Sequence, residues 1–422
     1  MLNPRWNFEL MPMPEYVYIK VDHDVRRGDA TYVSKGDFVK VGQPIVFHSG
    51  EYKSVLYSSV SGQVEDFIIS RDYGTLESEY IKIKTDGKQD VWEGLKPPII
   101  NNRRDLLSAI ESCGIRGIEG ITLASCLQLA DHELDRLDTL VVNAAELVDY
   151  GEIELSVIKQ DAEAIIETIC LTMELLGLHK CYIGVQESRL DAISCLKWFL
   201  KERELSNIEI VPLLHSCPPG SDRLLVFETA GELIDARMLP TDMGILIANI
   251  LSFSVLGHYL KEGLPVTHKV ILVTDAHGTV SGNVLTPLGA PLADIIAYCN
   301  ADNIPPKQIL LGGYDAAHLL KNHDMPLGRD NLAVFIFDDE DYEGPRVPCA
   351  KMCSDCDVCK HNCPSHLDPG EIYQAYMENN IERLKKTGVE ECAECGRCAY
   401  VCPDKKSLGY VVKIAKQLVQ QL

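Results

Sequence analysis

Two short stretches near the end of the chain carry the same cysteine spacing, and this repeat constrains the fold more than any other feature. Each stretch reads Cys-x2-Cys-x2-Cys-x3-Cys-Pro, once as CSDCDVCKHNCP and again as CAECGRCAYVCP. These cysteines, half of the 16 in the chain, are Cys353, Cys356, Cys359, Cys363, Cys392, Cys395, Cys398 and Cys402. Cysteines concentrated in this way in an intracellular chain indicate metal or redox chemistry rather than disulfides.

The repeated spacing favours a pair of [4Fe-4S] clusters whose ligands are crossed. Three cysteines separated by two residues let a tight loop wrap one corner of an iron–sulfur cube while its N–H groups point at the sulfides. The fourth cysteine, followed by proline, leaves that loop and binds the other cluster. We therefore expect cluster 1 to be held by Cys353, Cys356, Cys359 and Cys402. Cluster 2 is expected on Cys392, Cys395, Cys398 and Cys363.

A structural zinc site is the alternative, because zinc sites also use paired Cys-x2-Cys knuckles. A third cysteine and a Cys-Pro fourth, repeated twice, do not suit one tetrahedral ion, so the clusters are preferred. Between the two motifs, PGEIYQAYMENNIERLKK reads as helix, with an apolar face made of Ile372, Ala375, Tyr376 and Met377. We expect a mostly helical domain that conducts electrons and contains no catalytic site.

Composition narrows the class of protein further. The 422 residues carry a formal net charge of −22, which leaves no basic stripe for a nucleic acid. The first residues, MLNPRWNFELMPMP, are too polar for a signal peptide. The most apolar stretch, Gly244–Leu260, is interrupted by polar residues and reads as one buried helix, not as a membrane span. We expect a cytoplasmic protein, free or at the periphery of the inner membrane, that meets the membrane only through a complex.

Changes in pattern divide the chain into four expected domains of a multidomain α/β plus α+β protein. Residues 1–97 are predicted to be all-β, since stretches such as Tyr16–Val21 alternate apolar and polar residues; this part resembles the barrel-sandwich hammerhead of lipoyl domains. Residues 103–262 alternate helix and strand signals, with two helices expected to end at Gly114 and Gly177, which predicts a parallel α/β sheet. Residues 265–340 read as strand, glycine-rich turn, strand and helix, and suit a β-grasp module. Residues 349–422 contain both cysteine motifs.

Three stretches, in this order, resemble a known family of electron-transport subunits. They are VSKGDFVKVGQPI with SSVSGQV, LPTDMGILIANILSFSVLGHYLKEGLPVTHKVILVT, and CAECGRCAYVCPDKKSLGYVVKIAK. The family is that of RnfC, the peripheral subunit of the Rnf electron-transport complex, with its cobalamin-reductase-type relatives. The resemblance implies a hammerhead, an α/β domain like the flavin subunit of respiratory complex I, a soluble-ligand-binding β-grasp (SLBB) module and a two-cluster ferredoxin domain.

The resemblance also implies an FMN pocket, and here the chain departs from the family. The family's GLGGAGFPT loop and NGAECEPY motif read GIRGIEGIT and NAAELVDY, and VQESRLDAI stands where IEDNKPEAI is typical. The candidate FMN residues carried over by position are Gly117, Gly120, Asn143 and Glu146. Glu119 adds negative charge near the expected phosphate, and Ile121 adds bulk where the backbone must come close. These departures weigh against ordinary FMN and NADH binding.

Three functions are compatible with these features. The first is an electron-transfer subunit that relays single electrons through two [4Fe-4S] clusters between a redox partner (a flavoprotein, ferredoxin or reductase) and a larger complex. The second is an NADH-linked FMN dehydrogenase subunit that feeds the clusters. The third is a non-catalytic assembly or ligand-sensing subunit. The altered glycine loop favours the first over the second, and the repeated cysteine motif disfavours the third. Homo-oligomerisation and the role of Cys349, an extra thiol beside the first motif, are left open.

Overall fold

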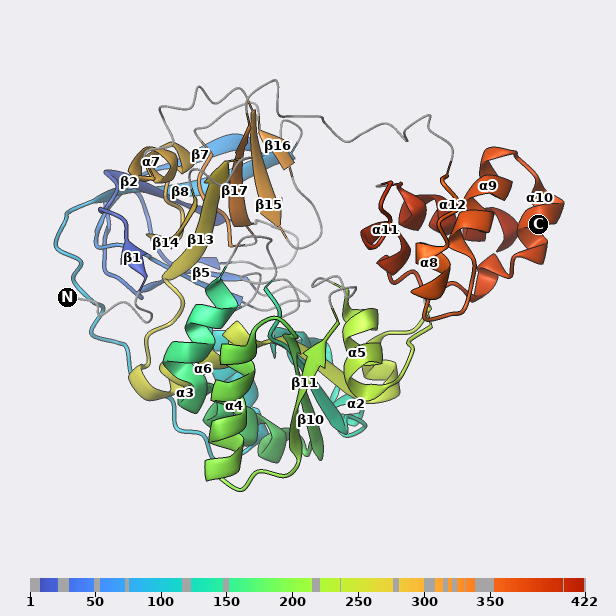
Figure 1. The fold of residues 1–422 in the computed structure, drawn as a ribbon. Coiled ribbons are helices and arrows are strands. Elements are labelled where there is room, and N and C mark those ends of the chain that lie inside the picture. The colour runs from blue at the N-terminus through green and yellow to red at the C-terminus, as the bar shows by residue number, and fades with distance from the viewer. Residues whose placement is uncertain are drawn as a thin grey trace.

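In the computed structural model, the described residues form four β-sheets and a helical C-terminal region (Figure 1). The residues that it describes are 8–21, 30–48, 54–72, 76–115, 123–146, 152–214, 221–235, 237–275, 281–299, 308–313, 318–320, 325–329, 331–337, 353–404 and 406–420.

Two antiparallel sheets make up the N-terminal part. One has the strand order β2-β8-β7-β4 and the other the order β3-β5-β6. Their bounds are β2 (Tyr16–Val21), β3 (Ala30–Thr31), β4 (Phe38–Val39), β5 (Pro44–His48), β6 (Ser54–Tyr57), β7 (Gly62–Asp72) and β8 (Leu76–Thr85). The strand predicted at Tyr16–Val21 is confirmed, with Val17, Ile19 and Val21 turned into a core that also holds Ile45 and Ile81.

A parallel sheet has the strand order β11-β10-β9-β12. Its strands are β9 (Thr139–Asn143), β10 (Lys180–Gln186), β11 (Ile208–Leu213) and β12 (Ile245–Asn249). One face packs against α1 (Arg103–Cys113), α3 (Ile153–Leu176), α4 (Leu190–Glu202) and α6 (Ile250–Glu262). Helix α5 (Asp222–Ala230) packs on the other face. Shorter segments are η2 (Leu123–Gln128), α2 (Asp131–Leu134) and η3 (Pro240–Met243). We call this sheet and its helices the α/β body.

Sequence placed two helix ends of the body correctly and one element wrongly. Gly114 and Gly177 end α1 and α3 in the left-handed conformation, with φ of 78° and 73°, as expected for glycine after a helix. The stretch predicted as one buried helix from Gly244 instead begins with strand β12, all five residues of which are buried. An apolar run looks alike in a buried strand and a buried helix, so its pattern could not separate the two. Asn249 marks the boundary by capping α6.

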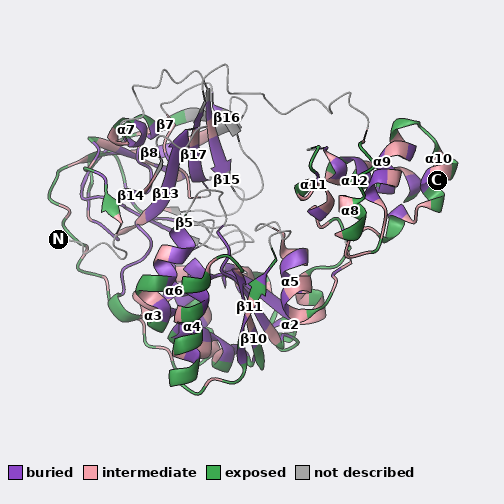
Figure 2. Ribbon diagram, in the orientation of Figure 1, coloured by how far each residue is buried: buried purple, intermediate pink, exposed green. Residues whose placement is uncertain are grey.

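The third part is a six-stranded mixed sheet with the order β1-β14-β13-β17-β15-β16 (Figure 2 shows β13 and β17 as largely buried). Its elements are β1 (Glu9–Leu10), β13 (His268–Asp275), β14 (Ser281–Pro287), β15 (Gln308–Gly313), β16 (His318–Leu320), β17 (Asn331–Phe337) and the accompanying helix α7 (Leu292–Tyr298). Strand β1 pairs in parallel with β14, so a segment that sequence assigned to the N-terminal domain lies in this sheet.

In the cysteine tail, residues 353–420, all of the described secondary structure is helical. It contains α8 (Val358–His361), α9 (Pro369–Met377), α10 (Ile381–Lys386), η5 (Val389–Glu391), α11 (Arg397–Tyr400) and α12 (Leu408–Gln420). The single helix expected between the motifs is two helices, because Asn380 caps the start of α10. Ile372 and Ala375 lie in the core as predicted, but Met377 is 59% exposed, so its assignment to the apolar face was wrong.

The structure divides the cysteines outside the two motifs by their burial. Cys113, Cys126 and Cys181 are buried, whereas Cys170, Cys195 and Cys299 are only partly covered. Cys217 and Cys349 lie outside the described residues. Across the part of the chain that the structure describes, no helix combines the length and apolar character that a membrane crossing requires.

Candidate iron–sulfur and ligand sites

The two cysteine loops, which we call loop 1 (353–363) and loop 2 (392–402), share an unusual backbone. In each loop the residue before the second cysteine has a positive φ, 50° at Asp355 and 55° at Glu394. The residue after the second cysteine does so again, 56° at Asp357 and 78° at Gly396. Left-handed residues at these places turn successive N–H groups toward the concave side of a loop, where they attract anionic atoms. The sequence repeat is therefore also a structural repeat.

Backbone N–H groups donate to the cysteine sulfurs at matching positions. Such bonds join Glu394 N to Cys392 Sγ (3.3 Å), Leu367 N to Cys363 Sγ (3.4 Å) and Lys406 N to Cys402 Sγ (3.5 Å). The donor lies four residues after the cysteine in both Cys-Pro segments. Donors to cysteine sulfur stabilise the anionic thiolate and, in iron–sulfur proteins, tune the reduction potential.

Four cysteines drawn from both loops line one cavity of about 140 Å³. They are Cys363, Cys392, Cys395 and Cys398. Burial raises the pKa of the last three thiols, that of Cys398 to about 12, and the nearby Cys363 thiol adds to each rise. The hydroxyl of Ser365, on the same cavity wall, is buried without a hydrogen-bond partner among the described residues. A group with acceptor atoms would satisfy that donor.

The remaining four cysteines also lie together. Burial raises the pKa of Cys353, and the neighbouring thiols of Cys356 and Cys402 raise it further. Burial likewise raises the pKa of Cys359, which shares a small hydrophobic core with Cys402 and Tyr373. Cys402 thus lies with loop 1, and Cys363 lies with loop 2.

Buried, positively charged side chains lie beside both groups of four cysteines. Arg397 and Lys416 are buried beside loop 2, and Lys416 Nζ donates to the carbonyl of Cys392 at 2.6 Å. Lys406, also buried, lies beside loop 1, 5.9 Å from the centre of the Tyr373 ring. A buried positive charge near a redox group favours its more negative, reduced state.

The geometry differs from that of a single-ion site. The described residues contain no group of three or more His, Cys, Asp or Glu side chains that could hold one metal ion. Loop 2 and Cys363 border a cavity that Ser365 also lines, and the N–H of Glu394 donates to the sulfur of Cys392. Thiolates around a cavity with surrounding donors fit a cluster that has its own acceptor sulfides.

The candidate FMN residues have a different environment from the one the family motif suggests. Gly117 and Gly120 lie outside the described residues. Asn143 and Glu146 are 6% and 5% exposed. Asn143 Oδ1 accepts a hydrogen bond from Ala145 N, and the two Glu146 oxygens accept from Ile153 N and Leu155 N at 3.0 and 2.9 Å. The Glu146 carboxylate therefore occupies the positive N-terminal end of α3, which would otherwise attract a ligand anion.

A residue that sequence analysis did not single out lies beside them. The strand order reverses between β9 and β12, the place where α/β sheets bind ligands at the carboxyl ends of their strands. There Asn143 pairs in register with Asn249, whose side chain is almost fully buried. Asn249 Oδ1 accepts from Leu251 N at 2.7 Å, while its Nδ2 has no partner among the described residues. An asparagine inside a long apolar run was the available signal.

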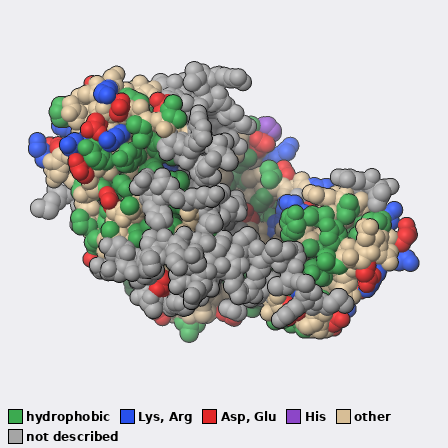
Figure 3. All heavy atoms as spheres, turned by 90° about the horizontal axis from the view of Figure 1, so that it is seen from above, with side chains coloured by type: hydrophobic (Ala, Val, Ile, Leu, Met, Phe, Trp, Pro, Cys, Tyr) green, Lys and Arg blue, Asp and Glu red, His purple; other side chains and the backbone are tan. Residues whose placement is uncertain are grey.

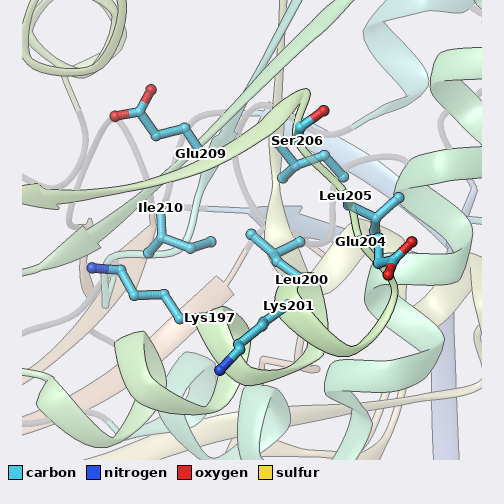
Figure 4. A pocket seen from close by; sticks show the side chains of 9 residues that line it. Lys197, Leu200, Lys201, Glu204, Leu205, Ser206, Glu209 and Ile210 are labelled. Carbon is cyan, nitrogen blue, oxygen red and sulfur yellow. The ribbon is translucent and has the colours of Figure 1, made fainter.

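A larger groove of about 560 Å³ lies elsewhere, between the end of α4 and the edge strand β11 (Figure 4). Leu200, Leu205 and Ile210 form its apolar part, and Lys197, Lys201, Glu204 and Glu209 are among its polar residues. It contains none of the predicted site residues, and its mixed charges favour no particular ligand.

Comparison with known proteins bears on the α/β body first. Residues 110–257 match the family model described as the Nuo51 FMN-binding domain. This range includes Asn143, Glu146 and Asn249.

Over most of its length the chain is similar to the C subunits of ion-translocating complexes. It is 25% identical to the C subunit of the proton-translocating ferredoxin:NAD(+) oxidoreductase complex of Clostridium ljungdahlii, covering 86% of this chain and 79% of that protein. It is 24% identical to the C subunit of the Na(+)-translocating ferredoxin:NAD(+) oxidoreductase complex of Acetobacterium woodii, covering 96% and 91%. For the C subunit of the ion-translocating oxidoreductase complex of Rhodobacter capsulatus the values are 25%, 92% and 75%. The predicted resemblance to RnfC-like proteins is confirmed.

Among solved structures, a chain of the NAD+-reducing [NiFe]-hydrogenase in the air-oxidized state matches with a TM-score of 0.46 and 14% identity. The match covers 76% of this chain and 63% of the hydrogenase chain.

Proposed function

We propose that this chain is an electron-transfer subunit of an oxidoreductase complex, relaying single electrons through two [4Fe-4S] clusters. The observation that carries the proposal is the cavity bordered by Cys363 together with Cys392, Cys395 and Cys398. These residues would hold one cluster, and Cys353, Cys356, Cys359 and Cys402 the other. Each cluster, when bound, supplies a site that gains or loses one electron.

The chain's own residues determine how such a site works. The cysteine thiols lose their protons when they bind iron, so cluster binding offsets the raised pKa values of the buried thiols. Backbone donors such as Glu394 N and Leu367 N hold the sulfurs in place. Apolar neighbours such as Tyr373 and Leu408 cover Cys359 and Cys402 of the loop 1 set. Buried cations next to both loops favour the reduced state.

The relatives suggest the setting in which the relay works. Because they are subunits of ion-translocating oxidoreductase complexes, we infer that this chain also joins other redox subunits, at the cytoplasmic periphery of a membrane. Ferredoxin and NAD(+), which appear in two relatives' names, are the first donor and acceptor to test. The N-terminal sheets as a barrel-sandwich hammerhead, and the six-stranded sheet as an SLBB-like β-grasp, would serve as docking modules.

A second candidate, an NADH-linked flavin dehydrogenase feeding the clusters, is favoured by two observations. Residues 110–257 match an FMN-binding domain, and Asn249 Nδ2 is a buried donor without a described partner at the switch point of the sheet. Asn249 would donate to an acceptor atom of the flavin, which when bound converts two-electron into one-electron transfer. Glu146 would act only by fixing α3, because its oxygens bond to that helix.

Anaerobic reconstitution of the full chain tests the relay. We expect about eight iron atoms and about eight sulfides per chain, and a broad visible absorbance that dithionite bleaches. Fewer than about two iron atoms per chain would contradict both clusters. The flavin candidate is tested in the same preparation by adding FMN and NADH. Retention of FMN that is lost in Asn249→Leu, with bleaching by NADH, would support it; absence of retained FMN would reject it.

A further inference from the structure

Loop 2 is fixed to the α/β body by contacts with one helix, α5. The Ser221 hydroxyl, which caps α5, donates to the carbonyl of Cys395 at 2.9 Å. Arg223 Nε donates to the carbonyl of Ala393 at 3.2 Å. In Figure 1 the cysteine tail, drawn in red, lies beside α5. The carbonyls of Cys395, a candidate ligand, and of Ala393 are therefore held by the first turn of this helix and its cap.

A buried ion pair completes the contact. Glu228, near the end of α5, pairs with Arg397, and the two side chains are 11% and 6% exposed. Arg397 lies between Cys395 and Cys398 in sequence, its backbone N–H donates to the Cys395 sulfur, and its charge acts on the same thiol. Breaking a buried pair leaves an uncompensated charge, so such a pair specifies one docked arrangement.

Helix α5 also reaches the ligand end of the parallel sheet. Leu225 and Val226 of α5 share a core with Val141 on β9 and with Ala145 just beyond that strand. Ala145 N donates to Asn143 Oδ1, at the position where the strand order reverses. One short helix thus contacts both the carboxyl end of β9 and loop 2.

Loop 1 has a different environment. Cys356 is exposed, as are Ser354, Asp355 and Asp357 around it. The hydrogen bonds of this loop run within the tail, from Ser354 to Asp404 and from Gln374 to Asp355. Figure 3 shows the tail from above, with hydrophobic side chains gathered on this face and charged ones at their margins. Loop 2 is held against the body, and loop 1 presents a ligand to solvent.

We propose that the Glu228–Arg397 pair positions loop 2 on α5, making the Cys363, Cys392, Cys395 and Cys398 site the cluster next to the α/β body, and that its charge balance sets that cluster's reduction potential. This inference rests on the proposed electron-transfer function. With both clusters bound, each transfer would move one electron between a one-electron carrier on the body side, cluster 2, cluster 1 and a protein partner at loop 1. The carrier at one end would be oxidised as the one at the other end is reduced, with no bond formed or broken.

Opposite single charge changes test the pair. Glu228→Gln removes a negative charge near cluster 2 and should raise that cluster's potential. Arg397→Gln removes a positive charge there and should lower it. We expect each to change the reduction equilibrium constant on the order of tenfold, about 59 mV for one electron, and the double variant to return toward the original value. The measurement is a redox titration of both clusters by electron paramagnetic resonance, in the reconstituted full chain.

Cluster 1 is the internal control and should keep its potential in all three variants. Arg383→Gln is the matched control, since Arg383 pairs with Glu371 and Glu378 within the tail, away from α5. Shifts of the same sign in both single variants, equal shifts of both clusters, or no shift with both clusters present would overturn the inference alone. A wild-type chain that holds no reducible cluster would instead overturn the proposed function. Glu228→Gln alters only the body, so the test does not depend on loop 2 tolerating Arg397→Gln.

Discussion

Loop 1 and loop 2 have the same spacing and the same pair of left-handed residues, yet they lie in different surroundings. Loop 2 rests on α5, with Arg397 and Lys416 buried beside it. Loop 1 leaves Cys356 exposed and forms its hydrogen bonds within the tail. The difference teaches that the repeat specifies how each loop folds, whereas contacts from distant parts of the chain specify what each loop faces.

Even the residues after the two Cys-Pro segments follow this division. Ser365, whose hydroxyl is buried, comes after Cys363-Pro364 and lines the loop 2 cavity. Asp404 occupies the equivalent place after Cys402-Pro403, and it accepts from the Ser354 hydroxyl at 2.6 Å, in loop 1. Each Cys-Pro segment therefore supports the loop of the other repeat, which is the expectation from crossed ligation.

The largest effect is expected from replacing the fourth cysteine of either motif, because this should remove one cluster and leave the other. Cys402→Ser is expected to remove the cluster of Cys353, Cys356 and Cys359, and Cys363→Ser the cluster of loop 2. Iron should fall from about eight to about four atoms per chain in each variant, and magnetic resonance should identify which cluster is left. Cys195→Ser, in helix α4, is the control and should keep both clusters. Selective loss of the loop 2 cluster in Cys402→Ser would show that the ligands are not crossed.

Disturbing the packing of α5 on the parallel sheet should speed hydrogen exchange in loop 2 but not in loop 1. A Cβ at Gly184 of β10 would lie 2.8 Å from Leu225 Cδ1 of α5 and 3.1 Å from Leu213. We expect Gly184→Ala to destabilise this packing by about 1–3 kcal/mol and to speed hydrogen exchange in α5 and loop 2. Gly282→Ala in β14, where a Cβ meets nothing within 4 Å, is the matched control. Equal acceleration in loop 1 would mean that α5 supports the whole tail.

The left-handed residue after the second cysteine is Asp357 in loop 1 and Gly396 in loop 2, so the loop 1 residue type can be tested in loop 2. Gly396 has a φ of 78°, and a Cβ there meets nothing within 4 Å, so a substitution costs only backbone strain. Gly396→Ala should cost about 1–2 kcal/mol. Gly396→Asp should cost less, because Asp357 holds the equivalent position in loop 1 and aspartate adopts this conformation more readily. Denaturant titration of the cluster absorbance measures both; a larger cost for aspartate would contradict the equivalence.

Removing the Ser365 hydroxyl should change the reduction potential of cluster 2, while the cluster itself stays bound. If the hydroxyl donates to a cluster sulfide, Ser365→Ala loses a hydrogen bond of about 1 kcal/mol that favours the reduced state. The equilibrium constant for reducing cluster 2 should fall several-fold, which lowers the potential of that cluster, and Ser365→Thr should restore both. A fall in cluster 1 as well would place the hydroxyl's effect outside the loop 2 cavity.

The smallest effect is expected at an exposed ion pair of loop 1. Lys360 pairs with Asp368 at 3.0 Å, with side chains 53% and 31% exposed. Exposed pairs contribute little and are screened by salt. Lys360→Gln should leave the stability and both potentials unchanged within error, in contrast to the buried Glu228–Arg397 pair. A shift of the cluster 1 potential that disappears in high salt would show that this pair matters.

The elements that could be predicted from the sequence are those determined by residues close together along the chain. The strand at Tyr16–Val21 and the glycines that end α1 and α3 follow from local alternation and backbone freedom. The division of one apolar run into β12 and α6 did not follow, since both elements are buried and their patterns coincide. Contacts between residues far apart in sequence, such as Ser221 with Cys395, leave no periodic signal at all.

Site residues divide in the same way. The spacing of the cysteines led to the expectation that Cys363 and Cys402 cross between loops, and this ligand assignment stays a prediction. In the structure Cys363 lines the loop 2 cavity and Cys402 lies near Cys353. The role of Glu146 was not accessible, because a carboxylate bonded to a helix seven to nine residues later looks in sequence like a ligand-binding acid. Asn249 was hidden inside a stretch whose composition suggested only burial.

The position of Cys402 beside loop 1 has a consequence for biosynthesis. A ribosome completes loop 1 at Cys363, but Cys402, which lies beside this loop in space, is made only after the rest of loop 2. The group that contains Cys363 is likewise complete only once Cys392, Cys395 and Cys398 have been made. Neither group has all its thiols until loop 2 has left the ribosome, so iron and sulfide delivered earlier would find only incomplete sites.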